Sequence, residues 1–424
     1  MLRIERFRDN PDEIKESEDY RGKDPEKVDK AIELDKAWRE NLQKLQELQE
    51  RRNEVGDKIA EMKQNGKDAS EHIEKMQEVK DTINELEDEV EKLKTDRDEL
   101  RMKIGNIVED SVPQGEDEDD NVPIKHWEPE EGKSKSGELA ADVLEDTDLL
   151  ETEKAAEVAG ERAYYLKNEL VRLNQALINY GLDKMQEKNY TPMQTPYMLN
   201  KEAMEGAAEL EDFHEQLYKL DRHERYLIAT SEQTLAAYHF DEILQPQELP
   251  RKYAGYSTNF RREAGKHGQQ TRGIWRLHQF EKIEQFIFCK PEESQDLHDE
   301  LLENAEEVMK DLNLPYRVVN VCTGDLGDTP AKKYDIEAWR PSLEEYGEVV
   351  SCSNCTEYQG TKLKTRIRRQ DSDNQTVHTL NSTLIATQRL MTIIIENNQT
   401  ERGIKVPEAL QGYMGGQKHI EMEE

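Results

Sequence analysis

Apolar residues recur every three or four positions, with one skipped step in each case, in two stretches near the start of the chain. The first stretch consists of Leu34, Trp38, Leu42, Leu45, Leu48, Val55, Ile59 and Met62. The second consists of Ile73, Met76, Val79, Ile83, Leu86, Val90, Leu93, Leu100 and Ile104. Turn-forming residues at 65–68 separate them. Such spacing places an apolar stripe along one side of a coiled-coil helix. It predicts two helices over residues 28–107 that fold back as an arm, each roughly 50 Å long at 1.5 Å per residue.

The chain changes character after this arm. Residues 111–125 combine prolines, a glycine and an acidic run, a composition that cannot bury apolar area and predicts a linker. Beyond it, helical spacing at residues 165–178 gives way to strand-like apolar runs at 226–229, 283–288 and 316–321. We therefore expect an N-terminal domain at 1–110, a linker at 111–125, and an α+β domain with a mostly antiparallel sheet at 126–424.

The composition is strongly polar and acidic. Of the 424 residues, 34% are hydrophobic and 36% are charged, and the formal net charge is −34. No apolar run approaches the roughly 18 residues of a membrane span, and the N-terminus lacks the pattern of an export signal, so we expect a cytoplasmic protein with no membrane partner. A phosphate-bearing partner would have to be bound by local basic groups. Acidic surfaces keep proteins soluble in strong salt, so the charge suggests a salt-adapted organism.

The four cysteines are Cys289, Cys322, Cys352 and Cys355. The last two have the C-x-x-C spacing of zinc and redox sites, but no second pair or paired-histidine element completes four ligands. Two small side chains near a strand are the favoured interpretation, and reduced thiols fit this usage better than a disulfide framework.

The segment at 259–284 is the most informative for function. It places Arg261, Glu263, Arg276 and Glu284 among apolar residues with strand character. Burying an unpaired charge is costly, so these side chains should face a polar site. A ligand with phosphates and an amine would satisfy them, whereas the alternative is an exposed hairpin with ordinary salt bridges.

This segment closely resembles motif 2 of class II aminoacyl-tRNA synthetases, in the form F-R-x-E-A-G…R-x-H-Q-F-x-K-x-E of the seryl-tRNA synthetases. Further blocks occur in the family's order: residues 230–232, residues 348–355, and residues 378–383 leading to Arg389. The arm, the acidic linker and the closing residues 406–416 also match. The resemblance implies an N-terminal antiparallel coiled-coil arm joined to a class II catalytic domain. It implies a ligase that activates L-serine with ATP and loads serine tRNA, with selenocysteine tRNA as a further acceptor left open.

The resemblance also implies how ATP and Mg²⁺ are bound. Arg261 would hold the α-phosphate, Glu263 the adenine amino group, and Phe280 the face of adenine. Arg389 would contact the γ-phosphate, which makes Arg261 and Arg389 the expected catalytic residues. The remaining ATP-binding positions are occupied by Arg262, Arg276, Leu277, Glu348, Val349, Val350 and Ser351, of which Glu348 and Ser351 would also bind the metal ion.

For serine, the resemblance implies Glu232 and Glu284 as the carboxylates that bind the substrate. Its other serine positions are Thr230, Ser231, Asn381 and Thr383. Buried groups committed to the serine hydroxyl are left unpaired when alanine binds, which gives strong rejection, whereas threonine must be excluded by size. In-line attack of the serine carboxylate on the α-phosphorus needs electrostatic stabilisation but no nucleophilic side chain.

The chain departs from the family pattern in a few places. Thr383 stands where a serine is usual, Gln388 where a glycine precedes the motif 3 arginine, and residues 128–147 fit poorly. Motif 1, which builds the homodimer in this class, is placed at the helix 161–182 and the following 190–196. Pro196 would be its proline, although a simple strand-edge proline explains it equally well.

Two other functions remain as alternatives. A homologue could load a carrier protein instead of tRNA, but such forms generally lack a full arm. A coiled-coil scaffold with an inactive catalytic domain would not need the charges at Arg261, Glu263, Glu232, Glu284 and Arg389. The arm is expected to read the long variable region of serine tRNA by its shape and backbone.

Overall fold

The computed structural model describes residues 1–145, 147–208, 216–263, 272–370 and 373–422. It contains two compact units, one formed by residues 2–107 and the other by Met1 together with residues 108–424. Among the described residues, none of the helices has the length and apolar character needed to cross a membrane.

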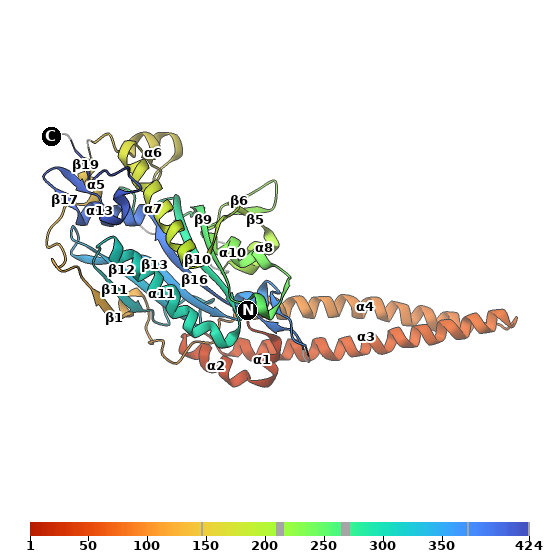
Figure 1. Cartoon of the computed structure of the whole chain (residues 1–424). Coiled ribbons are helices and arrows are strands. Elements are labelled where there is room, and N and C mark those ends of the chain that lie inside the picture. Colours follow the sequence, from red (N-terminus) through yellow and green to blue (C-terminus); the bar gives the residue numbers. More distant parts are fainter. Residues whose placement is uncertain (146, 209–215, 264–271, 371–372, 423–424) are drawn as a thin grey trace. The chain divides into compact units, whose positions relative to one another are not determined.

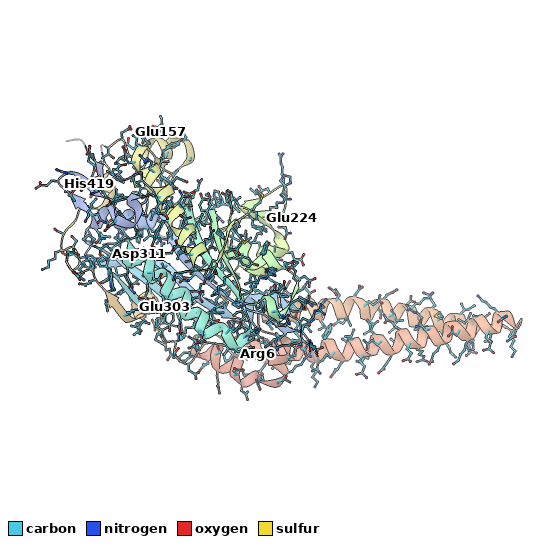
Figure 2. All side chains as sticks on the ribbon, in the orientation of Figure 1. Arg6, Glu157, Glu224, Glu303, Asp311 and His419 are labelled. Carbon is cyan, nitrogen blue, oxygen red and sulfur yellow. The ribbon has the colours of Figure 1, made fainter. Side chains whose placement is uncertain are left out.

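The N-terminal unit is entirely helical. Its helices are α1 (Ile4–Asp9), α2 (Pro11–Tyr20), α3 (Glu26–Gln64) and α4 (Ser70–Arg101). α3 and α4 lie side by side along their length and reverse direction at the predicted turn (Figure 1), and Figure 2 shows the side chains that project from them. The predicted arm is therefore confirmed.

A buried carboxylate joins helices of this unit. Asp35 on α3 is 1% exposed and accepts two 2.8 Å hydrogen bonds from Arg8 of α1. Arg39 of α3 and Arg97 of α4 donate further hydrogen bonds to Asp35, at 3.0 and 3.1 Å. A buried charge is tolerated when it is paired and hydrogen-bonded, so this cluster fixes how α1, α3 and α4 pack.

The C-terminal unit is built on an eight-stranded sheet with the order β1-β11-β12-β13-β16-β10-β9-β4. These strands are β1 (Val122–Trp127), β4 (Thr191–Gln194), β9 (Arg251–Phe260), β10 (Gln279–Cys289), β11 (Tyr316–Asn320), β12 (Lys332–Arg340), β13 (Glu345–Thr356) and β16 (His378–Ala386). All neighbouring pairs are antiparallel except β4 with β9. The expected α+β fold with a mostly antiparallel sheet is confirmed.

Long helices cover the sheet (Figure 1). α7 (Asn168–Glu187) contacts β10 and β16, and α11 (Ser294–Asp311) contacts β13 and β16. Gly181 allows α7 to approach the sheet closely, because a Cβ at this position would lie 2.7 Å from side-chain atoms of both Ile283 and Ile385. Successive strand residues point to opposite faces, so Lys282 and Glu284 face away from α7, toward the side that holds the site.

α13 (Thr387–Asn397) directly follows β16 and brings Arg389 to the site. Gln388, which stands where the family usually has a glycine, is buried, and its Oε1 accepts a hydrogen bond from the Glu281 N–H of β10 at 2.8 Å. The poorly matching segment 128–147 packs near this helix, where the Ala140 N–H donates to Glu396 at 3.4 Å. Residues 122–125 of the predicted linker belong to β1, because their backbone pairs with β11.

Shorter elements complete this unit. The helices are α5 (Ala140–Val143), α6 (Glu153–Ala159), α8 (Lys201–Ala207), α10 (Ser231–Ala236), α12 (Tyr358–Lys362) and α14 (Glu408–Gln411). The 3-10 turns are η1 (Glu118–Asp120), η2 (Ala237–His239), η3 (Pro246–Glu248) and η5 (Pro291–Glu293). The small strands are β2 (Leu150–Glu151), β3 (Tyr165–Leu166), β5 (Met198–Asn200), β6 (Lys219–Leu220), β7 (Arg225–Leu227), β8 (Ile243–Leu244), β14 (Arg366–Ile367), β15 (Gln375–Thr376), β17 (Gln399–Thr400), β18 (Gly403–Lys405) and β19 (His419–Glu421).

Candidate functional site

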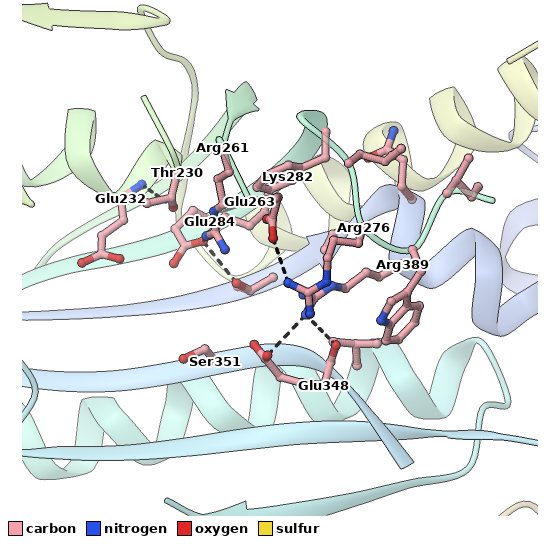
Figure 3. Close-up of a pocket in the computed structure, with 18 of the residues that line it drawn as sticks. Thr230, Glu232, Arg261, Glu263, Arg276, Lys282, Glu284, Glu348, Ser351 and Arg389 are labelled. Carbon is pink, nitrogen blue, oxygen red and sulfur yellow. Dashed lines mark hydrogen bonds and ion pairs between the residues drawn. The ribbon is translucent and has the colours of Figure 1, made fainter. Parts of the chain in front are cut away.

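A cavity opens on the face of the sheet formed by β10, β13 and β16 (Figure 3). Residues far apart in sequence meet there because these strands are neighbours in the order β13-β16-β10. Predicted site residues that line it are Thr230, Glu232, Arg261, Glu263, Arg276, Leu277, Phe280, Glu284, Glu348, Val349, Ser351, Asn381, Thr383 and Arg389. The structure thus gathers most of the expected residues around one space.

Three predicted site residues do not line this cavity. Val350 on β13 is 2% exposed, belongs to the hydrophobic core and does not line the cavity, although Val349 and Ser351 on either side of it do. Ser231 is fully buried at the start of α10 and donates to the Gly255 carbonyl at 3.1 Å. Arg262 is outside the lining too, and its backbone N–H donates to Gln216 at 2.9 Å.

Three guanidinium groups give the cavity a positive side. Arg276 pairs with Glu263 at 2.7 Å, and Arg389 donates to the Glu348 carbonyl at 2.7 Å. Arg261 lies over the Phe280 ring at 5.2 Å and donates to the Ala229 carbonyl at 3.2 Å. Figure 3 shows Arg276 and Arg389 near Glu348. Such clustered guanidiniums match the geometry and charge of phosphate groups.

Trp275 supports this positive side and was missed by the sequence reasoning. Its ring lies 5.4 Å from the Arg389 guanidinium and 4.4 Å from that of Arg340. Arg340 is held in turn by Glu396, at 2.7 and 3.2 Å. Only its place beside Arg276 in the motif 2 segment could have drawn attention to Trp275, because a lone tryptophan usually indicates core packing.

The other side of the cavity carries two carboxylates. Glu232 accepts hydrogen bonds from Gln359 at 2.8 Å and from Asn381 at 3.1 Å. Its position is set by Thr230, whose hydroxyl oxygen accepts the Glu232 N–H at 3.2 Å and caps α10. In Figure 3, Thr230 and Glu232 lie apart from Arg276 and Arg389, so acceptors for an amine occur at a distance from the phosphate-binding groups.

Glu284 is 1% exposed and is held by Lys282 at 2.5 Å and by Thr383 at 3.4 Å. Burial raises the pKa of Glu284, while Lys282, Thr383 and Arg261 oppose that rise. Lys282 was not predicted as a site residue. Its spacing of two from Glu284 could have revealed it, because residues i and i+2 of a strand share a face.

Glu348 on β13 also lines the cavity, and its charge acts on Asp335 of the neighbouring strand β12, which does not line it. Burial, together with the charges of Glu348 and Asp325, raises the pKa of Asp335 to about 7. Burial also acts on Glu348, but the charges of Arg389, Lys333 and Arg261 outweigh it and hold the pKa of Glu348 below its usual value. Glu348 is therefore ionised at neutral pH.

The donor set at Glu348 and Ser351 fits a magnesium ion. Mg²⁺ prefers hard oxygen ligands and is often held by one or two protein oxygens together with substrate phosphates and water. An ionised carboxylate and a hydroxyl beside the guanidinium cluster provide that arrangement. Among the described residues there is no cluster of three or more His, Cys, Asp and Glu side chains for a metal, so the substrate phosphates would have to supply further ligands.

The four cysteines are buried and free. Burial raises the pKa of the Cys352 thiol, which makes it a neutral and unreactive group. These observations agree with the structural interpretation of the C-x-x-C pair.

Two family models match the chain. Residues 1–108 match the seryl-tRNA synthetase N-terminal domain, and residues 216–398 match the class II tRNA synthetase core domain of the G, H, P, S and T enzymes. A serine–tRNA ligase from Helianthus annuus is 44% identical over 434 residues, covering 99% of this chain and 98% of that protein. One from Archaeoglobus fulgidus is 44% identical over 438 residues, covering 97% and 95%.

Solved structures agree with these matches. The seryl-tRNA synthetase from Pyrococcus horikoshii complexed with ATP has a TM-score of 0.91 and 41% identity, with 100% of both chains covered. The cytoplasmic serine–tRNA ligase from Naegleria fowleri in complex with AMP has a TM-score of 0.88 and 39% identity, covering 100% of this chain and 99% of that one.

Proposed function

The chain belongs to the seryl-tRNA synthetase family and has serine–tRNA ligase activity, and we propose that the cavity on β10, β13 and β16 is where both steps occur. In the first step, L-serine and ATP form seryl-adenylate and pyrophosphate. In the second, the seryl group passes to the 3′-terminal adenosine of serine tRNA. The observation that carries this site assignment is that one cavity is lined both by three guanidinium groups and by the carboxylates of Glu232 and Glu284. These two carboxylates lie at a distance from the guanidinium groups of Arg276 and Arg389 (Figure 3).

The arginines provide the electrostatics of the first step. Attack of the serine carboxylate on the α-phosphorus builds negative charge on the phosphate oxygens, and preorganised cations stabilise it without reorganising. Arg261 is assigned to the α-phosphate and Arg389 to the γ-phosphate. Phe280 lies under Arg261 and supplies an aromatic face for adenine, while Glu263 accepts from its amino group. No side chain forms a covalent bond to the substrate.

Glu348 and Ser351 are the residues that would hold Mg²⁺ with the nucleotide. When bound, the ion would neutralise phosphate charge and fix the phosphate conformation. Arg389, assigned to the γ-phosphate, donates to the backbone carbonyl of Glu348 at 2.7 Å and pairs with its carboxylate at 3.4 Å, which keeps this carboxylate next to the guanidinium.

Glu232 and Glu284 are the proposed acceptors for the ammonium and hydroxyl groups of serine. Asn381 orients Glu232, and Thr383 donates to Glu284, so both carboxylates are fixed before serine arrives. Alanine leaves a buried acceptor unpaired, which costs about 1–3 kcal/mol in binding. Threonine carries an additional methyl group that this enclosed space should exclude.

Further assignments concern the whole protein. We propose that the arm of α3 and α4 binds the variable region of serine tRNA, and that selenocysteine tRNA is an additional acceptor. A homodimer built through the motif 1 region, around α7 and β4, and a cytoplasmic location complete this proposal. The full-length arm favours tRNA over a carrier protein as the acceptor.

Serine-dependent exchange of pyrophosphate into ATP, followed by charging of purified serine tRNA in high KCl, tests the proposal. Arg261→Ala should reduce exchange by at least about a hundredfold, whereas the neighbouring Arg262→Ala should change it by less than about fivefold. A protein without residues 28–107 should form adenylate but fail to charge tRNA. Equal losses in the two arginine variants would contradict the site assignment, and absence of exchange in the intact protein would contradict the activity.

A further inference from the structure

Lys282 is a buried cation for which the proposed reaction has no use. It lies on β10, is 7% exposed and lines the cavity two residues before Glu284. Its Nζ is 2.5 Å from Oε2 of Glu284. Immobilising a lysine in a buried site costs side-chain entropy and desolvation, so a residue placed there in contact with a proposed serine ligand calls for a functional explanation.

The contacts of Glu284 are asymmetric. Lys282 and Thr383 both bind Oε2, at 2.5 and 3.4 Å. Within the described part of the chain, Oε1 has no hydrogen-bond partner. One oxygen is thus anchored to the protein, and the other is left as an acceptor for a ligand in the cavity.

The groups around Glu284 come from several strands. Burial opposes its charge, and the groups that favour the charge are, in decreasing order, Lys282 on β10, Thr383 on β16, and Arg261 after β9. Cys352 on β13 is a buried neutral thiol, and Glu232 on α10 lines the same cavity. Lys282 is therefore the strongest of the groups that favour the charged form of Glu284 over the neutral form.

We propose that Lys282 is a positioning residue for serine recognition: it anchors Oε2 of Glu284 and thereby presents a charged, correctly oriented Oε1 to the ammonium and hydroxyl of serine. This inference rests on the proposed role of Glu284 in the serine site. Both groups of serine are donors, and a charged acceptor binds them about twice as strongly as a neutral one. A protonated Glu284 would instead present a donor.

The proposal predicts a selective effect on serine. Lys282→Met should raise the KM for serine about tenfold to a hundredfold and the KM for ATP by less than about threefold. Discrimination against alanine should decrease, because an uncharged acceptor left unpaired is less costly than a charged one. Lys282→Arg should restore most of the serine affinity. Lys282→Gln keeps a hydrogen-bond donor but not the charge. Its serine KM therefore separates the effect of orienting the Glu284 carboxylate from the effect of keeping that carboxylate ionised.

The pH dependence provides a readout that loss of structure would not produce. Without Lys282, the pKa of Glu284 rises further, so the carboxylate is neutral at low pH and ionises as pH increases. The serine KM of Lys282→Met should fall as pH increases, and it should depend on pH more strongly than that of the unaltered protein. Lys332→Met is the matched control: Lys332 is 6% exposed and pairs with Glu109 at 2.8 Å, but it does not line the cavity.

A double-mutant cycle decides whether Lys282 acts through Glu284. In the Glu284→Gln background, Lys282→Met should cause almost no additional loss of serine affinity. An equal loss in both backgrounds, or an equal rise of the KM values for serine and ATP, would overturn the inference. If the unaltered protein shows no serine-dependent exchange, the proposed function fails instead, so the two failures are distinguishable.

Discussion

Replacing Gly347 by Ala tests whether Trp275 sets the position of Arg389. Gly347 precedes Glu348 on β13, and a Cβ there would lie 2.8 Å from Cζ2 and 2.9 Å from Cη2 of Trp275. The indole cannot retreat easily, because Arg340 lies 4.4 Å from its ring and is fixed by the buried Glu396. The same Cβ would lie 3.1 Å from Cδ of Arg340, and a displaced indole would disturb Arg389, whose guanidinium lies 5.4 Å from the ring.

The size of the effect follows from these distances. Ordinary carbon contacts require about 3.5–4.0 Å, so the ring must move by roughly 0.7 Å or more. Overpacking of this kind costs about 1–3 kcal/mol. If about 1.4 kcal/mol of it is expressed as misplacement of Arg389, the KM for ATP rises about tenfold, while the KM for serine stays within about threefold.

Steady-state pyrophosphate exchange, with ATP and serine varied separately, measures this effect. Gly412→Ala is the matched control, because no atom lies within 4 Å of a Cβ added there. A Gly347→Ala protein that is less stable but has an unchanged KM for ATP would refute the coupling of Trp275 to Arg389. A similar KM change in Gly412→Ala would show that the effect is not local.

Three further predictions concern other parts of the molecule. Asp35→Asn should lower the free energy of unfolding of the arm unit by about 3 kcal/mol in urea titrations, because Arg8, Arg39 and Arg97 lose their shared carboxylate. Burial would raise the pKa of Asp35, but the hydrogen bond and charge of Arg8 and the charges of Arg39 and Arg97 hold it below its usual value. The stabilisation is therefore complete above the unfolded pKa of about 3.9 and is lost as pH falls through the lower folded pKa, so stability that does not decline in acid would contradict it. Phe280→Leu should weaken ATP binding by about 1–3 kcal/mol, seen as a higher KM for ATP with the serine KM unchanged; equal changes would argue against adenine stacking. The net charge of −34 predicts that the thermal unfolding midpoint rises from low to multimolar KCl, and a constant midpoint would remove the basis for salt adaptation.

The sequence alone determined the arm and most of the cavity. The three-and-four spacing of apolar residues specifies two paired helices, because a helix repeats every 3.6 residues and each stripe must be covered by the other. The motif 2 segment identified Arg261, Glu263 and Glu284, since charged residues in a segment with apolar, strand-like positions should face a polar site. These signals are local, so they can be recognised without the rest of the fold.

The tertiary structure decided which neighbours complete the site. Trp275 matters because of Arg389, a residue distant in sequence that the strand and helix arrangement brings close to it. The same arrangement turns Val350 away from the cavity, although it stands between two residues that line it. Contacts of this kind depend on strand order and on which face each side chain takes, and a single sequence leaves both undetermined until the sheet is assembled.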